Sequence, residues 1–220
     1  MAARIYCQHW INESFTVTTT GGAAPSCAFT AGVQYLTPDD VIARLNATLG
    51  ALVTFAIDDT TGLVSVTWGT SPATLTWGNS DLSDYLGFGG NLTHADTVGV
   101  QPVDGWWYGK AAGPWGLSRR VDSDDVISNY GRATMVDRVG YYETGKIEIW
   151  LHRSIDGTFL DSMAAAYDLA VAWAANPIAI DDGSGTYRPC VLVDSWEFAP
   201  QSLDPETVYL ELEVITWPAG

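Results

Sequence analysis

The chain is poor in basic residues, and lysine is almost absent from it. Its 220 residues include 10 Lys+Arg against 26 Asp+Glu, which gives a formal net charge of −16. Proteins that grip DNA or RNA use Lys and Arg to displace counterions from the phosphates. We therefore expect no specific nucleic-acid binding. The acidic excess is expected to keep the protein soluble, and a channel along which DNA slides without sticking is the alternative use.

Cysteine is also scarce. Cys7, Cys27 and Cys190 are odd in number, widely spaced and outside any CxxC pair. A disulfide framework needs paired cysteines, and a zinc site needs closely spaced ligands. We expect reduced and mostly buried thiols, because a free cysteine packs as a small apolar side chain.

Long apolar runs are missing as well. No stretch approaches the roughly 18 apolar residues of a membrane-spanning helix. Residues 1–10 lack the apolar segment of a secretory signal peptide. The sequence therefore predicts no membrane partner and a protein that folds in a cytoplasm.

Aromatic residues, by contrast, are abundant. The chain has 10 Trp and 10 Tyr, its hydrophobic content is 47%, and 16% of its residues are charged. This composition predicts a folded protein rather than a disordered one. Aromatic side chains fill cores, anchor protein interfaces and form sugar-binding surfaces. Composition alone does not separate these three uses.

The first half of the chain alternates strand and turn signals around one helix. Thr37 is expected to cap a helix over residues 38–49, with Pro38 at its first position and Gly50 after its end. Strands are expected at residues 14–20, 52–57, 63–68 and 75–77. The second and third of these strands form a hairpin, because Asp58–Gly62 between them has the composition of a hairpin loop.

The second half predicts the same kind of unit. A helix is expected at about residues 162–174, capped by Asp161. Strands are expected at residues 134–139, 147–152, 190–198 and 208–217, with a turn at 143–145 between the first two. We therefore expect an α+β fold of predominantly antiparallel sheet with two packed helices, in one compact body or two similar lobes.

The expected division has one lobe at residues 1–98, a connecting segment at 99–133 and a second lobe at 134–220. The connecting segment is aromatic and rich in Gly and Pro, and no period of 2 or 3.6 runs through it. Its aromatic residues Trp106, Trp107, Tyr108 and Trp115 are the candidate interface residues. A buried position between the two halves and a sugar-stacking surface are the alternatives for these rings.

Patterns of catalytic or metal-binding residues are absent. His9, His94 and His152 lie far apart and outside any HExxH pattern, and Ser195 lacks the G-x-S-x-G elbow of a hydrolase. The acidic segments 122–125 and 181–185 lack the spacing of a calcium loop and are expected to be turns. Glu211 and Glu213 are expected on a solvated strand face. We predict no enzyme, no catalytic residue, no cofactor and no metal.

One segment, at residues 75–92, is expected to form a short strand followed by one or two helical turns. A glycine then ends the turns and directs the chain back toward the same core. Ser80 or Asp81 is expected to cap the turns, and Gly87 to end them in the left-handed conformation. The side chains expected to share the core are Trp77, Leu82, Tyr85, Leu86 and Phe88. This segment is therefore predicted to be a structural element of the fold rather than an active site.

This pattern of a Trp, a polar turn, a Leu and Leu-Gly-Phe-x-Gly resembles an element of virion structural proteins of tailed bacteriophages, in the tail or the head-to-tail neck. Segments 51–77 and 100–115 fit the same resemblance, which covers roughly the first half of the chain. The resemblance implies a virion protein made in the host cytoplasm, with no catalytic residues. Its partners would be copies of itself, in a homo-oligomeric ring or tube, and neighbouring virion proteins. A carbohydrate-binding module with an aromatic surface is the alternative function.

Overall fold

The computed structural model describes residues 2–20, 25–69, 73–110, 118–127, 134–152, 163–181, 185–200 and 207–216. The fold is α+β, and every strand pair within these ranges is antiparallel. The helices are α1 (Pro38–Leu49), α2 (Ser80–Tyr85) and α3 (Met163–Ala175). The predicted fold class is confirmed, with the short turn at α2 as a helix beside the two longer ones.

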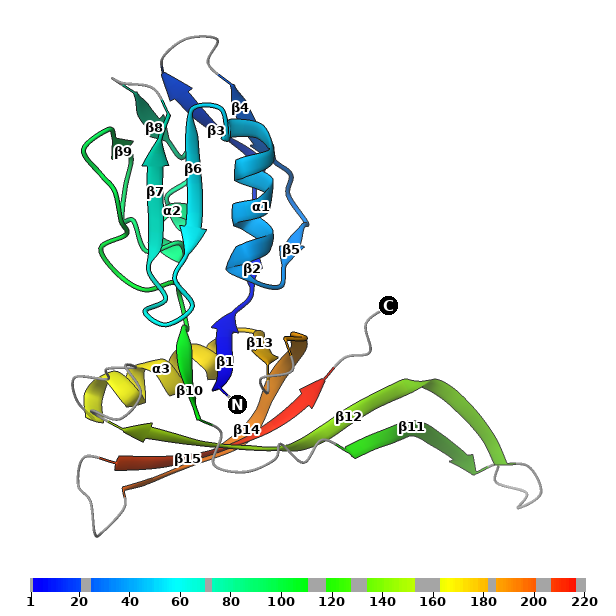
Figure 1. The fold of residues 1–220 in the computed structure, drawn as a ribbon. Coiled ribbons are helices and arrows are strands. Elements are labelled where there is room, and N and C mark those ends of the chain that lie inside the picture. The colour runs from blue at the N-terminus through cyan, green and yellow to red at the C-terminus, as the bar shows by residue number, and fades with distance from the viewer. Residues whose placement is uncertain are drawn as a thin grey trace.

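Figure 1 shows two lobes that stand one above the other. The upper lobe holds α1, α2 and a four-stranded sheet in the order β4-β3-β8-β9, together with the pairs β6–β7 and β2–β5. Its strands are β2 (His9–Trp10), β3 (Phe15–Thr20), β4 (Ser26–Phe29), β5 (Gln34–Tyr35), β6 (Val53–Ile57), β7 (Val64–Trp68), β8 (Thr74–Thr76) and β9 (Leu92–Thr93). One apolar core runs between these elements.

The lower lobe holds α3 and a seven-stranded sheet in the order β10-β1-β13-β14-β15-β12-β11. Its strands are β1 (Ala2–Cys7), β10 (Trp107–Lys110), β11 (Ser118–Ile127), β12 (Thr134–His152), β13 (Ile178–Asp181), β14 (Arg188–Pro200) and β15 (Thr207–Thr216). The two lobes differ in strand order, so they do not repeat one topology.

Helix α1 has the termini that its sequence predicts. Thr37 is the N-cap and forms a capping box with Asp40, and Pro38 stands in the first turn. Gly50 is the C-cap, and its N–H donates to the carbonyl of Asn46 at 3.0 Å. The apolar face buried against the sheet consists of Val41, Ile42, Leu45 and Leu49. The side chain of Asn46 also exchanges two hydrogen bonds of 2.8 Å with the backbone of Phe55, which fixes the helix to β6.

The first strand does not belong to the lobe in which the sequence analysis places it. Residues 1–98 are expected there as one lobe, but β1 pairs with β10 on one side and with β13 on the other, in the lower sheet. Ile5 and Tyr6 are completely buried in this position. The chain therefore begins in the lower lobe, crosses to the upper lobe at Gln8 and returns at Gly105.

Two predictions about the middle of the chain are wrong. The segment 99–133 is expected to be irregular, but β10 and β11 both lie in it. Residues 134–152 are expected to form two strands and a turn, but they form the single strand β12. Gly145 stays in the ladder because it pairs with Val214 on β15, so the predicted turn at 143–145 is absent.

Helix α3 confirms the second long helix of the prediction, while its expected cap, Asp161, lies outside the described residues. Ala170 and Trp173 are completely buried, and Val171 is 43% exposed. The helix is therefore buried on one side and solvated on another at its C-terminal end, although its sequence is apolar nearly all round.

Candidate functional site

The aromatic segment lies inside the fold. Trp107 is 1% exposed and pairs with Ile5 of β1, while Trp106 is 9% exposed and packs on the backbone of Gly62. A Cβ atom at Gly62 would come within 2.4 Å of the indole of Trp106. The predicted interface role of Trp106 and Trp107 does not match this position, because buried rings offer no surface to a second subunit or to a sugar. The expected interface residue Trp115 lies outside the described residues.

Tyr108, the third candidate interface residue, is half-buried at the boundary of the two lobes. The guanidinium of Arg4 lies 5.8 Å from the centre of its ring, in a cation–π arrangement. Arg4 also forms an ion pair of 2.9 Å with Asp59, which belongs to the loop between β6 and β7. Tyr108 therefore takes part in the contact that links β1 of the lower lobe to the upper lobe.

Hydrogen bonds join the two lobes where the chain crosses between them. The indole N–H of Trp173 donates to the carbonyl of Gly105 at 2.8 Å. The hydroxyl of Tyr85 donates to the carbonyl of Cys7 at 3.1 Å. Burial raises the pKa of Tyr85 well above its usual value, so this hydroxyl stays protonated and keeps its donor role. The lobes are therefore connected by buried bonds as well as by the chain.

His9 lies beside this junction. Its ring stacks on Tyr85 with 4.5 Å between the ring centres. Burial lowers the pKa of His9, and the nearby carboxylate of Asp81 opposes this shift. The neutral imidazole is therefore the favoured form, and the stacking on Tyr85 gives it a packing role rather than a catalytic one.

The run at residues 75–92 folds as predicted, apart from its helix cap. Asn79, rather than Ser80 or Asp81, is the N-cap of α2, and its side chain accepts from the N–H of Asp81 at 2.7 Å. Asn79 has the extended backbone that a cap requires, so the cap lies one residue before the earlier of the two predicted caps, and the helix begins at Ser80. Gly87 is left-handed, with φ of 79°. The expected core residues Trp77, Leu82, Tyr85, Leu86 and Phe88 are all buried.

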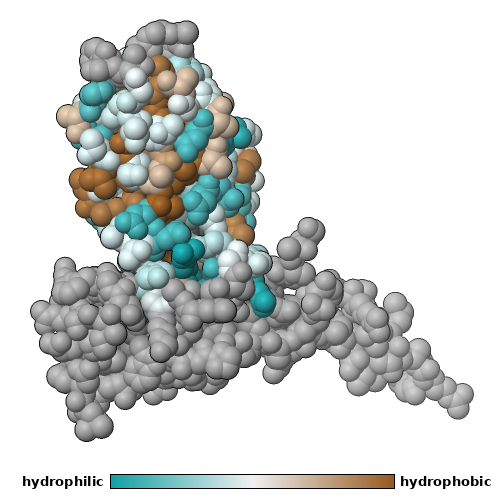
Figure 2. Space-filling view, in the orientation of Figure 1, coloured by the Kyte–Doolittle hydropathy of each residue, from teal (hydrophilic) through white to brown (hydrophobic). Residues whose placement is uncertain are grey.

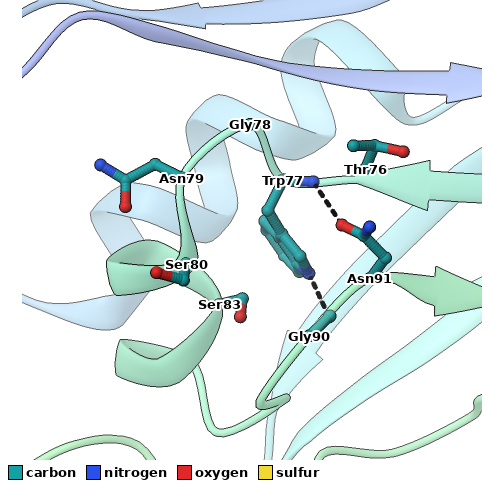
Figure 3. A pocket seen from close by; sticks show the side chains of 8 residues that line it. All are labelled: Thr76, Trp77, Gly78, Asn79, Ser80, Ser83, Gly90 and Asn91. Carbon is teal, nitrogen blue, oxygen red and sulfur yellow. Dashed lines mark hydrogen bonds between the residues drawn. The ribbon is translucent and has the colours of Figure 1, made fainter.

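A hollow of about 330 Å³ opens beside this run, as Figure 3 shows. Its lining residues are Thr76, Trp77, Gly78, Asn79, Ser80, Ser83, Gly90 and Asn91. None of them is ionisable, so the hydroxyl of Ser83 has no general base among the lining residues. The indole of Trp77 is 1% exposed and donates to the carbonyl of Gly90, so its face is not offered to a ligand. The hollow therefore lacks the groups of an active site.

The other candidates for chemistry lie on different elements of the fold. His94 packs near Trp68, with 5.9 Å between the ring centres, and Ser195 lies on β14. The acidic segment 122–125 belongs to strand β11, which corrects the predicted turn. Glu211 and Glu213 lie on β15 as expected. Among the residues that the structure describes, no group of three or more His, Cys, Asp or Glu side chains could hold a metal ion.

The described surface is mixed in polarity. Figure 2 shows polar and apolar residues interspersed over the visible face of the upper lobe. Among the described side chains, the exposed large apolar residues are Trp10, Val33, Val98, Val100 and Val171, and Trp10 is the one aromatic residue of this set. A platform of several exposed aromatic rings is thus absent from the side chains that the structure describes. None of its described helices is long and apolar enough to cross a membrane.

A two-stranded arm extends from the lower sheet, as Figure 1 shows at the right. Strand β11 pairs with β12 along residues 118–127, whereas β15 pairs with β12 from Glu143 onward. Residues 120–127 and 134–142 thus pair with each other and have no third described strand beside them. We call residues 118–127 and 134–144 the ribbon. Sequence reasoning missed it, although apolar residues on both sides of residues 128–133 are typical of a hairpin.

No protein-family model matches the chain, and no curated protein matches it.

Proposed function

We propose that this chain is a structural subunit of a tailed-bacteriophage virion, in the tail or the head-to-tail neck. It works by assembling with copies of itself and with neighbouring virion proteins. The phage assignment is supported by the resemblance at residues 75–92, where the aromatic and leucine residues pack in the core. The assembly mechanism is supported by the ribbon.

The ribbon is the single observation that carries assembly. A two-stranded antiparallel ribbon has no interior, and alone in water it is marginally stable at best. Its outer part carries the apolar residues Val126, Ile127, Met135 and Val136. These positions have no third described strand beside them, so a strand of another molecule would extend the sheet here. A second subunit is the simplest source of that strand.

The edges of the lower sheet suit the same role. Its two edge strands are β10 and β11, and each has one hydrogen-bonded neighbour in the described sheet. An edge strand presents N–H and C=O groups on which a strand of another subunit can pair, and we assign this role to β11. The net charge of −16 limits unprogrammed association at these edges. Assembly would therefore depend on complementary surfaces rather than on non-specific association.

The test is light scattering over a concentration series, with negative-stain images of the same sample. We expect the mass to exceed that of one chain and the images to show rings or tubes. Val126→Lys should shift the mass toward that of one chain, because it adds a charge to the apolar part of the ribbon. Val100→Lys is the matched control, because Val100 is 74% exposed on the upper lobe. A wild-type mass of one chain at every concentration would contradict the proposal.

A further inference from the structure

A buried hydroxyl without a partner lies at the hollow beside residues 75–92. Ser83 lines this hollow, which Figure 3 shows, and its side chain is 0% exposed. Its hydroxyl has no hydrogen-bond partner in the part of the chain that the structure describes. A buried hydroxyl that lacks a partner lowers stability, so it calls for a physical reason. A ligand in the hollow would supply the missing hydrogen bond.

The hollow also offers amide groups. The side-chain carbonyl of Asn91 accepts from the N–H of Trp77 at 3.1 Å, which leaves the NH₂ group of this exposed side chain to donate to a ligand. Asn79 uses its side-chain carbonyl in the same way, on the N–H of Asp81. A volume of about 330 Å³ lies at the lower end of the range for ligand pockets. The hollow therefore fits a small, uncharged unit that both donates and accepts hydrogen bonds.

A sheet face rich in hydroxyl groups continues from the hollow. In β3, β4, β8 and β9 exposed residues alternate with buried ones, so one face of this sheet packs on the core and the other meets solvent. The exposed residues, which we call the hydroxyl face, are Thr16, Thr18, Thr20, Ser26, Ala28, Thr74, Thr76 and Thr93. All but Ala28 carry a hydroxyl. Thr76 also lines the hollow, so the hollow and the hydroxyl face form one continuous surface.

The strand register arranges these hydroxyls in rows. One row holds Ser26, Thr18 and Thr76, and the next holds Thr20, Thr74 and Thr93. Neighbours within a row are about 4.8 Å apart, and the rows are about 6.8 Å apart along the strands. The face therefore presents hydrogen-bonding groups at regular short intervals, next to a hollow for a single ring.

The hydroxyl face is an uncharged area on an acidic lobe. In residues 8–104 the one basic residue is Arg44, against nine acidic residues. Arg44 borders the face at β4, where it donates to the carbonyl of Ala28 at 3.1 Å. Asp96 borders it at β9, where its carboxylate accepts from the hydroxyl of Thr93 at 2.9 Å. A charged partner gains little over the face itself, and an anionic polymer is repelled by the lobe.

We propose that the hollow and the hydroxyl face bind a neutral glycan, with one sugar ring in the hollow and the next sugars along the rows of hydroxyls. Sugar hydroxyls both donate and accept hydrogen bonds, as Ser and Thr side chains do. A protein partner is less well matched, because protein interfaces are enriched in aromatic residues, Met and Arg and depleted in Ser. The ring of Trp77 stays covered, so binding depends on hydrogen bonds rather than on ring stacking. This binding goes beyond the proposed assembly and does not depend on it.

Calorimetric titration of the full chain with hexasaccharides tests the inference. Maltohexaose, cellohexaose and chitohexaose are the neutral probes, and hexagalacturonate is the anionic control. We expect a dissociation constant of about 1 mM or lower for at least one neutral probe, and binding at least about tenfold weaker for hexagalacturonate. A wild type that binds none of the neutral probes at about 5 mM overturns the inference.

The double variant Thr18→Val, Thr76→Val removes two neighbouring hydroxyls of one row and keeps the β-branched shape of both side chains. We expect it to weaken the binding at least about tenfold, because two hydrogen bonds to the sugar are lost. Thr67→Val is the matched control, since Thr67 is an exposed threonine on β7, outside this sheet. It should bind like the wild type.

Ser83→Ala separates ligand binding from a structural role. It removes a buried hydroxyl that has no partner among the described residues, so the melting temperature should stay the same or rise. Sugar binding should nevertheless weaken several-fold, because the ligand loses its hydrogen bond to this hydroxyl. If Ser83→Ala and the double variant both bind sugar like the wild type, the inference is overturned. Weaker self-assembly of the double variant without any sugar binding would assign the face to a second copy instead. None of these results bears on assembly through the ribbon, which has its own test.

Discussion

Replacing Gly87 by alanine is expected to destabilise the protein by about 3 kcal/mol or more. Gly87 has φ of 79°, a left-handed conformation that a residue with a Cβ adopts at a cost. A Cβ at this position would also come within 2.0 Å of the carbonyl oxygen of Gln101, which is backbone and has little freedom to move. The backbone strain and the steric clash of the added Cβ therefore both contribute to the loss of stability. Chemical denaturation of the wild type and the variant measures the difference in free energy of unfolding.

Two neighbouring glycines provide matched controls. Gly89 is also left-handed, with φ of 69°, but a Cβ there would meet nothing within 4 Å. Gly89→Ala should cost about 1 kcal/mol, which is the conformational part alone. Gly90 has open space and no left-handed backbone, so Gly90→Ala should be close to neutral. Equal effects at Gly87 and Gly90 would contradict the packing described for residues 75–92.

Replacing Trp77 by alanine is expected to cost about 3–5 kcal/mol of stability. Trp77 is 1% exposed and stacks on Phe88 with 5.5 Å between the ring centres. Its ring also lies 6.0 Å from that of Phe55, and its indole N–H donates to the carbonyl of Gly90 at 2.8 Å. Alanine would leave a large cavity between these elements. The free energy of unfolding in denaturant measures the cost.

Two further variants, Trp77→Phe and Trp10→Ala, are controls for Trp77→Ala. Phenylalanine keeps most of the apolar contact and loses the hydrogen bond to Gly90, so it should cost less than alanine does. Trp10 is 51% exposed, so its replacement by alanine should cost under about 1 kcal/mol. A small loss for Trp77→Ala, similar to that for Trp10→Ala, would show that the ring is not part of the core.

Helix α1 and the run at residues 75–92 could be predicted because their signals are local. Thr37, Pro38 and Gly50 mark the ends of α1 by rules that act within a few residues. Gly87 marks the end of the turns after α2 in the same way. The misplaced cap at Asn79 shows the limit of such rules, because Ser, Asp and Asn are nearly equal as caps.

The lower sheet could not be predicted because it depends on partners far apart in the sequence. Strand β1 pairs with β10 and β13, and nothing near residues 2–7 in the sequence indicates either partner. Gly145 has the composition of a turn, yet it remains in β12 because β15 supplies its ladder partner. Local propensity is a weaker constraint than a complete ladder of hydrogen bonds.

The position of the aromatic segment could not be predicted for a related reason. An aromatic, Gly-rich segment is compatible with an interface, a core or a sugar-binding surface, and its sequence does not say which strands lie beside it. The pairing of β10 with β1 places Trp107 in the interior. The ribbon is the candidate surface instead, because its residues 120–127 and 134–142 have no third described strand beside them.

Hydrogen–deuterium exchange of the ribbon amides tests assembly through this surface most directly. The amides of residues 120–127 and 134–142 are compared at a concentration where the chain assembles and at one where it does not. We expect their exchange to slow at least about tenfold on assembly, while the amides of α1 exchange equally in both samples. Equal exchange of the ribbon amides in both samples would contradict assembly through the ribbon.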